Sequence, residues 1–267
     1  MKIWKNTNTI DKYIDGFETT EDKNEAEIAI LGSKKIELSQ FPVLKGIFRC
    51  GVGKDNIPIE EASGRGIAVG FPSLSTIDII YDETASFTCS AIFRMLYNDI
   101  GSLKPWVKIE RRTCKDKNLL IIGSGNIGSR VKYLMERFLK VTVYDKLNNN
   151  EAQLKELMSV ADVVTLHIPY NKENHELIDR EKLSWLKDEA ILINTSRGAI
   201  VSEEALYEEI KSGRIRAAFD VYWIEPYEGI LKQFHPERFY MTPHVASTCS
   251  TFVQETAKDF KAFIKEL

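Results

Sequence analysis

A buried-strand pattern runs directly into a glycine-rich turn at residues 119–128, which read Leu-Leu-Ile-Ile-Gly-Ser-Gly-Asn-Ile-Gly. The spacing G-x-G-x-x-G is typical of a dinucleotide-binding turn. Gly123 permits the tight turn, Gly125 lets the backbone approach a pyrophosphate, and Gly128 allows the next helix to pack closely on the strand. Three glycines at this spacing also fit a plain strand-to-helix turn, so the residues that follow have to distinguish the two interpretations.

The residues after the turn favour a dinucleotide site. Apolar residues recur at helical spacing: Val131, Leu134, Met135 and Phe138. Residues 140–145 then have the pattern of a second buried strand, which ends in Asp145, seventeen residues past Gly128. An acid near this position binds the adenosine ribose in dinucleotide folds. The simpler alternative is a solvated acid at a strand end.

Strand and helix patterns alternate through the rest of the chain. Strands are predicted at 25–32, 46–49, 66–70, 161–167, 190–194, 215–221 and 238–241. Helices are predicted at 57–63, 82–97, 180–186 and 203–212. Repeated βα units predict an α/β fold with a doubly wound parallel sheet of the Rossmann type. Ligands of such sheets bind beyond the carboxyl ends of the strands.

The chain becomes polar around Gly101 and Pro105, which indicates a domain boundary near residue 100. Residues 104–117 contain six basic residues against only Glu110 and Asp116. This segment fits either a solvated connector or a docking patch.

Charge and composition exclude several classes of function. A net charge of −3 gives no overall positive field, so neither nucleic acid nor an anionic membrane is expected as a partner. Residues 1–7 lack the apolar core of a secretory signal, and no later run reaches the roughly 20 apolar residues of a membrane span, which predicts a cytoplasmic protein. The cysteines are scattered without metal-ligand spacing, which predicts no metal site and no disulfide, only buried or half-buried thiols: Cys50, Cys89, Cys114 and Cys249.

Polar residues with matching chemistry lie at or after the ends of three of the predicted strands. They are Arg197 after one strand, Asp220 at the end of the next, Glu225 five residues later, and His244 after the last. An arginine can hold a carboxylate bidentately, and a histidine can transfer the proton that accompanies hydride transfer. A neighbouring glutamate would stabilise the imidazolium. Taken singly, these residues also fit a surface salt bridge, a solvated loop acid and a structural histidine.

Several separated blocks between Leu119 and Ser250 closely resemble the D-isomer-specific 2-hydroxyacid dehydrogenases. Beyond the glycine turn, the matching blocks are 161–169, 193–198, 217–226 and 242–246, which hold the strand ending in His167-Ile168-Pro169, the arginine, the acid and the histidine. Upstream, residues 49–57 resemble the substrate-domain loop of that family. A glycine-rich βα turn is the simpler interpretation of this upstream loop.

The resemblance implies a role for each matching residue. Arg197 would bind the carboxylate and keto oxygen of the substrate, Glu225 would pair with His244, and His244 would be the acid/base. Cofactor contacts are implied for Gly123, Gly125, Asn126, Ile127, Gly128, Asp145, His167, Ile168, Pro169, Thr195, Ser196 and Asp220, with Asp220 on the nicotinamide carboxamide. The N–H groups of Val52 and Gly53 would grip a substrate carboxylate.

The implied protein is an NAD-dependent oxidoreductase that interconverts a small D-2-hydroxy acid and its 2-keto acid. Its expected domains are a flavodoxin-like substrate domain at 1–100, completed by a C-terminal helix at 246–267, and an NAD-binding Rossmann domain at 101–245. A homodimer is expected through the helix at 82–97, which is richer in apolar residues than a solvent-facing helix needs.

Two departures from the family bear on these expectations. The substrate domain and the segment at 98–118 are short for the family, and Ser247 stands where many relatives have glycine. An NAD-sensing binding protein without turnover therefore remains as the alternative function.

Overall fold

The structure is a computed structural model that describes all residues from 1 to 267. Two compact units are formed, one by Met1–Ile80 with Ser247–Leu267 and the other by Tyr81–Ala246. Helix α2 (Leu74–Leu96) passes from the first unit into the second at Tyr81, whereas the sequence placed the division near residue 100.

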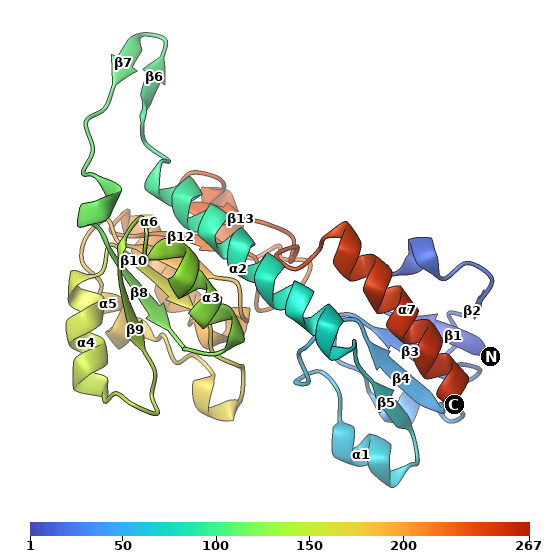
Figure 1. Cartoon of the computed structure of the whole chain (residues 1–267). Helices are drawn as coiled ribbons and strands as arrows, with labels where there is room; N and C mark the ends of the chain where they lie inside the picture. The colour runs from blue at the N-terminus through green and yellow to red at the C-terminus, as the bar shows by residue number, and fades with distance from the viewer. The chain divides into compact units, whose positions relative to one another are not determined.

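The first unit is built on a five-stranded parallel sheet (Figure 1). Its strands are β1 (Lys2–Lys5), β2 (Glu18–Thr19), β3 (Ile28–Leu31), β4 (Gly46–Arg49) and β5 (Ala68–Gly70). They lie in the order β2-β1-β3-β4-β5, which is the flavodoxin-like order. Strands β1 and β2 were not predicted, because their short, charged sequences give little strand pattern.

Helices and loops cover both faces of this first sheet. Helix α7 (Ser250–Glu266) packs Phe260 against Phe48 of β4, with ring centroids 5.4 Å apart. The opposite face is covered by α1 (Ile59–Gly64) and by short 3₁₀ turns, and it buries Phe41, Leu38 and Ala62. The 3₁₀ helices of the chain span Asp11–Tyr13, Leu38–Gln40, Cys114–Asp116, Lys172–Asn174, Gly198–Ile200 and Ile230–Phe234.

The second unit contains a six-stranded parallel sheet in the order β13-β12-β11-β10-β8-β9. Its strands are β8 (Asn118–Ile122), β9 (Lys140–Tyr144), β10 (Val163–Leu166), β11 (Ile191–Asn194), β12 (Arg216–Phe219) and β13 (Phe239–Met241). Its helices are α2, α3 (Asn126–Met135), α4 (Glu151–Val160), α5 (Arg180–Ser184) and α6 (Glu203–Ser212). The predicted α/β class with a doubly wound parallel sheet is confirmed.

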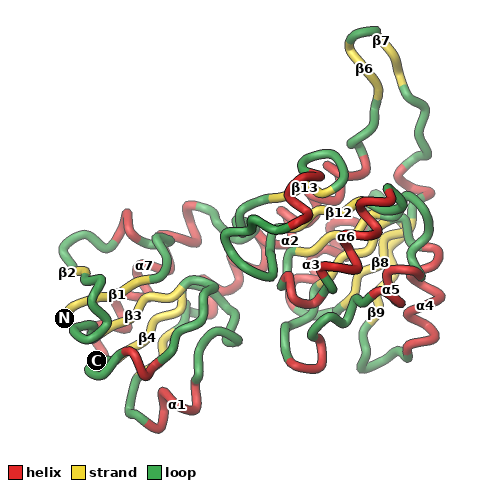
Figure 2. The backbone as a smooth tube through the Cα atoms, turned by 180° about the vertical axis from the view of Figure 1, so that it is seen from behind, coloured by secondary structure: helices red, strands yellow, loops and turns green.

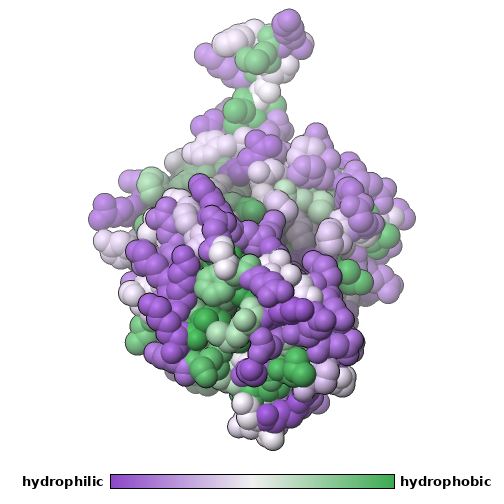
Figure 3. All heavy atoms as spheres, turned by 90° about the vertical axis from the view of Figure 1, so that its right-hand side faces the viewer, coloured by the Kyte–Doolittle hydropathy of each residue, from purple (hydrophilic) through white to green (hydrophobic).

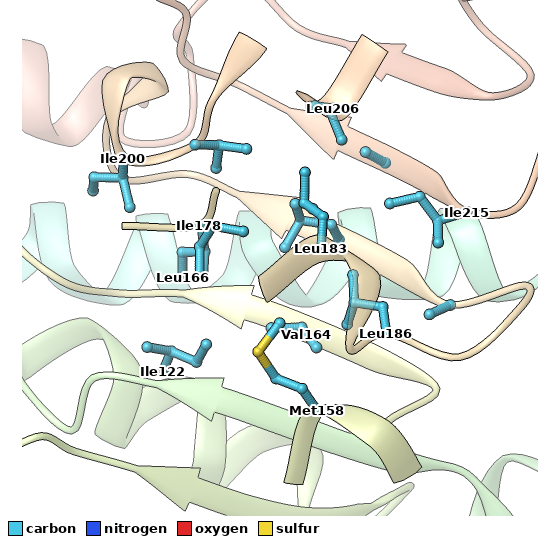
Figure 4. Close-up of a cluster of buried hydrophobic side chains, with 14 of the residues drawn as sticks. Ile122, Met158, Val164, Leu166, Ile178, Leu183, Leu186, Ile200, Leu206 and Ile215 are labelled. Atoms are coloured by element: carbon cyan, nitrogen blue, oxygen red, sulfur yellow. The ribbon is translucent and has the colours of Figure 1, made fainter. Parts of the chain in front are cut away.

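Alternate residues of the central strands enter two different cores, because side chains along a strand point to opposite faces. In β8, Leu120 and Ile122 join the core formed with α4, α5 and α6, part of which Figure 4 shows around Met158 and Leu183. Leu119 and Ile121 join the core formed with α2 and α3. Both faces of the sheet are therefore covered by helices.

The apolar residues at helical spacing after the glycine turn are only partly buried, and the last of them, Phe138, lies beyond the end of α3. Val131 and Met135 are buried in the core, but Leu134 and Phe138 are 37% and 49% exposed. The ring of Phe138 instead packs edge-on against Phe93 of α2, with centroids 5.3 Å apart. Of the four apolar residues at helical spacing, only Val131 and Met135 therefore lie in the core.

An antiparallel hairpin, β6 (Gly101–Leu103) and β7 (Trp106–Lys108), projects from the second unit (Figure 2). The sequence indicated a solvated connector or a docking patch here, and no hairpin. Leu103 and Trp106 are 76% and 75% exposed, and hydrophobic and hydrophilic residues mix at this tip in Figure 3. Gly101 is required for the pairing, because a Cβ there would lie 2.1 Å from the Val107 carbonyl oxygen.

The remaining global features concern membranes, metals and cysteines. None of the helices has the length and apolar run that crossing a membrane requires. No group of three His, Cys, Asp or Glu side chains is arranged to hold a metal ion. All four cysteines are free thiols, with Cys50 and Cys89 buried and Cys114 and Cys249 half-buried.

Candidate active site

All six strands of the second sheet are parallel, so their carboxyl ends meet at one edge. A predicted site residue follows each of these ends: Gly123, Asp145, His167, Arg197, Asp220 and His244. Strand order reverses between β8 and β10, which is where a doubly wound sheet opens a ligand crevice.

The glycine turn lies at this reversal, and two of its glycines are sterically required. Gly123 has φ +104°, and a Cβ there would lie 2.4 Å from the carbonyl oxygen of His167, the residue after β10. A Cβ on Gly128 would lie 2.1 Å from the Gly123 carbonyl oxygen. These close approaches hold α3 against the end of β8, as the sequence predicted.

The third glycine faces open space. A Cβ on Gly125 would have no neighbour within 4 Å. Gly125 is the N-cap of α3, and no side chain caps the free N–H groups of this helix. Asn126 is exposed, and Ile127 packs into the core beside it. Free N–H groups beside open space form a site suited to an anion such as a pyrophosphate.

Asp145 ends β9 beside the glycine turn. Its carboxylate accepts hydrogen bonds from the hydroxyl and the amide of Ser124, at 2.5 and 3.1 Å. The Ser124 hydroxyl is the main reason that the pKa of Asp145 lies below its usual value, so this side chain is an anion at neutral pH. The neighbouring Lys146 pairs with Glu173 at 3.1 Å.

The segment after β10 lies against the turn. The His167 ring nitrogen Nε2 is 3.0 Å from the Thr165 hydroxyl, and burial lowers the pKa of His167 to about 3. This imidazole is therefore neutral at physiological pH. Ile168 packs against the core and Gly123, and the Pro169 carbonyl accepts a hydrogen bond from Asn174.

Arg197 is positioned by a turn that Asn194 organises. The Asn194 side chain accepts hydrogen bonds from Ser196 and donates one to the Arg197 carbonyl oxygen at 2.9 Å. The half-buried Arg197 guanidinium donates to the Ser196 carbonyl oxygen at 2.7 Å. Thr195 is buried, and its hydroxyl lies 2.8 Å from that of Thr88 on α2.

Asp220 is 1% exposed and directs its carboxylate at the loop that holds His244. One oxygen accepts the Thr242 hydroxyl (2.6 Å) and the Val245 N–H (2.9 Å), and the other accepts the Ala246 N–H (2.8 Å). Burial raises the pKa of this carboxyl, and the three donors oppose that rise.

Glu225 and His244 meet, nineteen residues apart in the sequence. The His244 Nδ1 atom lies 2.9 Å from each carboxylate oxygen of Glu225, and the two side chains are 23% and 31% exposed. His244 has φ +53°, in the left-handed region that non-glycine residues rarely adopt. This histidine can therefore reach solvent or a ligand while a carboxylate fixes its other nitrogen.

Several contributors to the site were not predicted. Ser124, Thr88 and Thr242 act through hydrogen bonds to Asp145, Thr195 and Asp220, respectively. Tyr222 hydrogen-bonds to Thr242 and donates its amide to Glu225. Ser124 and Tyr222 lie inside the motifs themselves, so attention to polar residues between motif positions could have found them.

Val52 and Gly53 lie in the first unit, in the loop after β4. The buried Arg49 supports this loop by donating to the Cys50 carbonyl oxygen at 2.8 Å and to Asn56 at 3.3 Å. Their predicted contact with a substrate carboxylate stays a prediction.

Comparison with known proteins identifies what this arrangement resembles. Residues 101–246 match the family model of the NAD-binding domain of D-isomer specific 2-hydroxyacid dehydrogenases. A hydroxypyruvate reductase of Thermotoga maritima is 34% identical over 221 residues, which cover 77% of this chain and 71% of that protein. A glyoxylate reductase of Thermococcus litoralis is 32% identical over 257 residues, covering 85% and 76%.

Solved structures show the same fold. A phosphoglycerate oxidoreductase from Vibrio cholerae superposes with a TM-score of 0.81 at 20% identity, covering 100% of this chain and 98% of that one. A D-lactate dehydrogenase from Aquifex aeolicus, solved with NAD and lactic acid, gives a TM-score of 0.78 at 24% identity, covering 100% and 96%.

Proposed function

The chain belongs to the D-isomer-specific 2-hydroxyacid dehydrogenases, whose NAD-binding domain it contains, and we propose that it interconverts a small D-2-hydroxy acid and its 2-keto acid. The observation that carries this proposal is the hydrogen-bonded pair of Glu225 and His244 at the sheet edge that also holds the glycine turn. A binding protein without turnover would have no need for a partly exposed acid/base pair.

The residues at the switch point fit a dinucleotide. The open space over Gly125 and the uncapped N-terminus of α3 suit a pyrophosphate, and Asp145 suits the hydroxyls of a ribose. Bound NADH would supply a hydride to the keto carbon of the substrate. Ile127, Ile168 and Thr195 would form the walls of the cofactor site, with Asp220 at its nicotinamide end.

His244 is the proposed acid. In keto-acid reduction its imidazolium would give the Nε2 proton to the carbonyl oxygen, while Glu225 holds Nδ1 and stabilises the positive charge. The other histidine at this edge, His167, is unsuited to the task, because burial keeps it neutral. The same pair would take the proton back in the oxidation direction.

Arg197 is the proposed substrate anchor. A guanidinium can hold a carboxylate bidentately and still polarise the adjacent keto oxygen, which would orient the substrate and stabilise developing charge. The amides of Val52 and Gly53 are proposed to donate hydrogen bonds to a substrate carboxylate. We propose that the substrate carries a small side chain, because the relatives above are named for glyoxylate and hydroxypyruvate.

Asp145 supports a preference for NADH over NADPH. Its carboxylate, anionic at neutral pH, would repel a 2′-phosphate. Lys146 could attract that phosphate, but its ammonium is engaged by Glu173.

Steady-state assays with NADH and a panel of glyoxylate, hydroxypyruvate, pyruvate and a branched 2-keto acid test the activity. Arg197→Ala should lower kcat/KM on the preferred acid by about thirty-fold to several thousand-fold, since loss of a desolvated charge pair costs about 2–5 kcal/mol. The matched control is Arg216→Ala, because Arg216 lies at the opposite, amino end of β12. Absence of turnover on the whole panel would contradict the proposed activity, and equal losses in both variants would remove Arg197 from its role.

A homodimer is also proposed, on grounds that differ from the predicted ones. The apolar side chains of α2 that suggested an interface, such as Ile92 and Met95, are buried against the chain's own sheet. The β6–β7 hairpin supplies the stronger argument, because an isolated two-stranded hairpin is at best marginally stable and this one exposes Leu103 and Trp106. Packing against a second copy would cover them. Light scattering at micromolar concentration should give a dimer, and Leu103→Ser with Trp106→Ser should shift it to monomer.

A further inference from the structure

The backbone of His244 is strained and has to be held by its surroundings. Its φ of +53° places a non-glycine residue in the left-handed region, a conformation that persists only where neighbouring contacts enforce it. Downstream, the enforcing contacts are the hydrogen bonds from Val245 and Ala246 to the carboxylate of Asp220. On the upstream side, Asp220 accepts the Thr242 hydroxyl, and a second residue contacts the Thr242 backbone.

Tyr222 holds the upstream side. Its hydroxyl accepts the Thr242 N–H at 3.0 Å and lies 2.9 Å from the Thr242 carbonyl oxygen, two residues before His244. The same hydroxyl is 2.8 Å from the Phe219 carbonyl oxygen at the end of β12. This phenol therefore reinforces the backbone hydrogen bond from Thr242 N–H to the Phe219 carbonyl oxygen (3.1 Å), which joins the ends of β12 and β13, the strands whose loops hold Glu225 and His244.

The backbone of Tyr222 contacts the other member of the pair. Its amide donates to Glu225 at 3.2 Å, through the same carboxylate oxygen that lies 2.9 Å from His244 Nδ1. Tyr222 thus contacts Glu225 directly and His244 through Thr242.

The segment that holds Tyr222 is itself fixed. A Cβ on Gly198 would lie 2.2 Å from the Tyr222 carbonyl carbon, so the segment packs directly on the residue after Arg197. The Trp223 indole donates to the Val201 carbonyl oxygen at 2.7 Å. The ring of Tyr222 stacks on that of Tyr227, with centroids 5.0 Å apart. These contacts do not involve the Tyr222 hydroxyl. Removing the hydroxyl should therefore affect the Glu225–His244 pair and leave the packing of the ring in place.

We propose that Tyr222 is a positioning residue, whose hydroxyl keeps His244 in its strained backbone conformation and in register with Glu225. The proposal rests on the proposed function, in which His244 transfers the proton. Tyr222 does not touch the reacting atoms, so its effect should appear in the rate of the chemical step and not in ligand affinity.

Two hydroxyl deletions in adjacent, stacked rings provide the test. Tyr222→Phe removes the contacts to Thr242 and keeps the ring and the amide. Tyr227→Phe is the matched control, because the Tyr227 hydroxyl bonds to Glu203 at 2.6 Å and to the Leu231 amide at 3.1 Å, neither of which belongs to the acid/base pair. Both variants lose a hydrogen-bonded hydroxyl, so both should lose thermal stability.

Only Tyr222→Phe should affect catalysis. We expect kcat for keto-acid reduction to fall about ten-fold, with KM for NADH and keto acid within about two-fold of wild type, since small errors in the placement of a catalytic group slow chemistry strongly. The primary deuterium isotope effect with NADH deuterated at the transferred position should rise, because the chemical step becomes more rate-limiting. Tyr227→Phe should leave both quantities unchanged.

Three outcomes would overturn the proposal: wild-type kcat in Tyr222→Phe, an equal fall in both variants, or a loss confined to KM. If Tyr222→Phe melts near the assay temperature, both variants are compared at a lower temperature, so that the kinetic comparison is still made. Absence of turnover in the wild type would instead reject the proposed function, which separates the two failures.

Discussion

Gly125→Ala should separate cofactor binding from folding. The added Cβ would meet nothing within 4 Å, so the protein alone has room for it. The backbone at this position, φ −68° and ψ −165°, is extended and accessible to alanine. The only object proposed to occupy the space above Gly125 is the pyrophosphate of the dinucleotide.

The expected change in the free energy of unfolding is small. Replacing glycine by alanine at an accessible conformation stabilises by about 0.4–1 kcal/mol through the unfolded chain. Glycine is preferred over alanine at an N-cap by a similar amount, which offsets the gain. The Tm without ligand should therefore stay within about 4 °C of wild type.

The expected loss of cofactor affinity is larger. A methyl group inserted into a close contact costs about 1–3 kcal/mol, which corresponds to roughly 5- to 150-fold in the Kd for NADH. Isothermal titration with NADH and thermal melts with and without NADH measure both quantities on the same sample.

Gly128→Ala is the matched control, and it should lower the stability of the free protein, which Gly125→Ala should leave nearly unchanged. Its Cβ would lie 2.1 Å from the Gly123 carbonyl oxygen, so α3 has to move away from the end of β8. The Tm without ligand should fall, despite a helix-propensity gain of about 1 kcal/mol. If Gly125→Ala binds NADH like wild type, or destabilises the free protein as much as Gly128→Ala does, the pyrophosphate does not lie over Gly125.

Three further predictions concern charge. Glu225→Gln removes the carboxylate that holds His244 Nδ1, so kcat for keto-acid reduction should fall by about ten-fold or more; wild-type kcat in a folded variant would contradict the pairing. Because burial lowers the pKa of His167 from 6.5 to about 3, the unfolded chain binds the proton first as pH falls, and stability should drop by about 2 kcal/mol between pH 6.5 and about 5. Urea unfolding of His167→Gln should lack this loss. Asp145 should make kcat/KM higher with NADH than with NADPH, and equal values would reject its proposed contact with the ribose.

The central strands and the glycine turn could be predicted because the surroundings of each position restrict which residue types can occupy it. Strands buried on both faces give continuous apolar runs such as 119–122, and the turn needs glycine where a Cβ would strike backbone. Helix α2 was predicted to begin at Asp82 but begins at Leu74. Its first turns are rich in Ser, Thr and Ile, which have modest helix propensity, and packing rather than propensity makes them helical.

The sequence was least informative where the structure depends on contacts between distant segments. The strands of the β6–β7 hairpin have only three residues each, too few to give a strand pattern, and the hairpin's stability depends on packing that the sequence does not reveal. Similarly, motif spacing suggested that Glu225 and His244 meet, but not the strained φ of His244 or the Tyr222 hydroxyl beside it. Such features arise from long-range hydrogen bonds that no local pattern encodes.

The strand order places the two ends of the proposed cofactor site at opposite edges of the second sheet. Asp145 follows the edge strand β9 and His244 follows the opposite edge strand β13, with five strand spacings, about 24 Å, between them. Gly123 and His167 lie between these ends at the switch point. An extended dinucleotide over this edge would therefore be gripped at its adenosine end by β8 and β9, and would react at its other end near β11 to β13. Substitutions at Gly125 or Asp145 should then change cofactor affinity and choice, whereas those at Arg197, Tyr222, Glu225 or His244 should change turnover, because the two groups act on opposite ends of the same bound molecule.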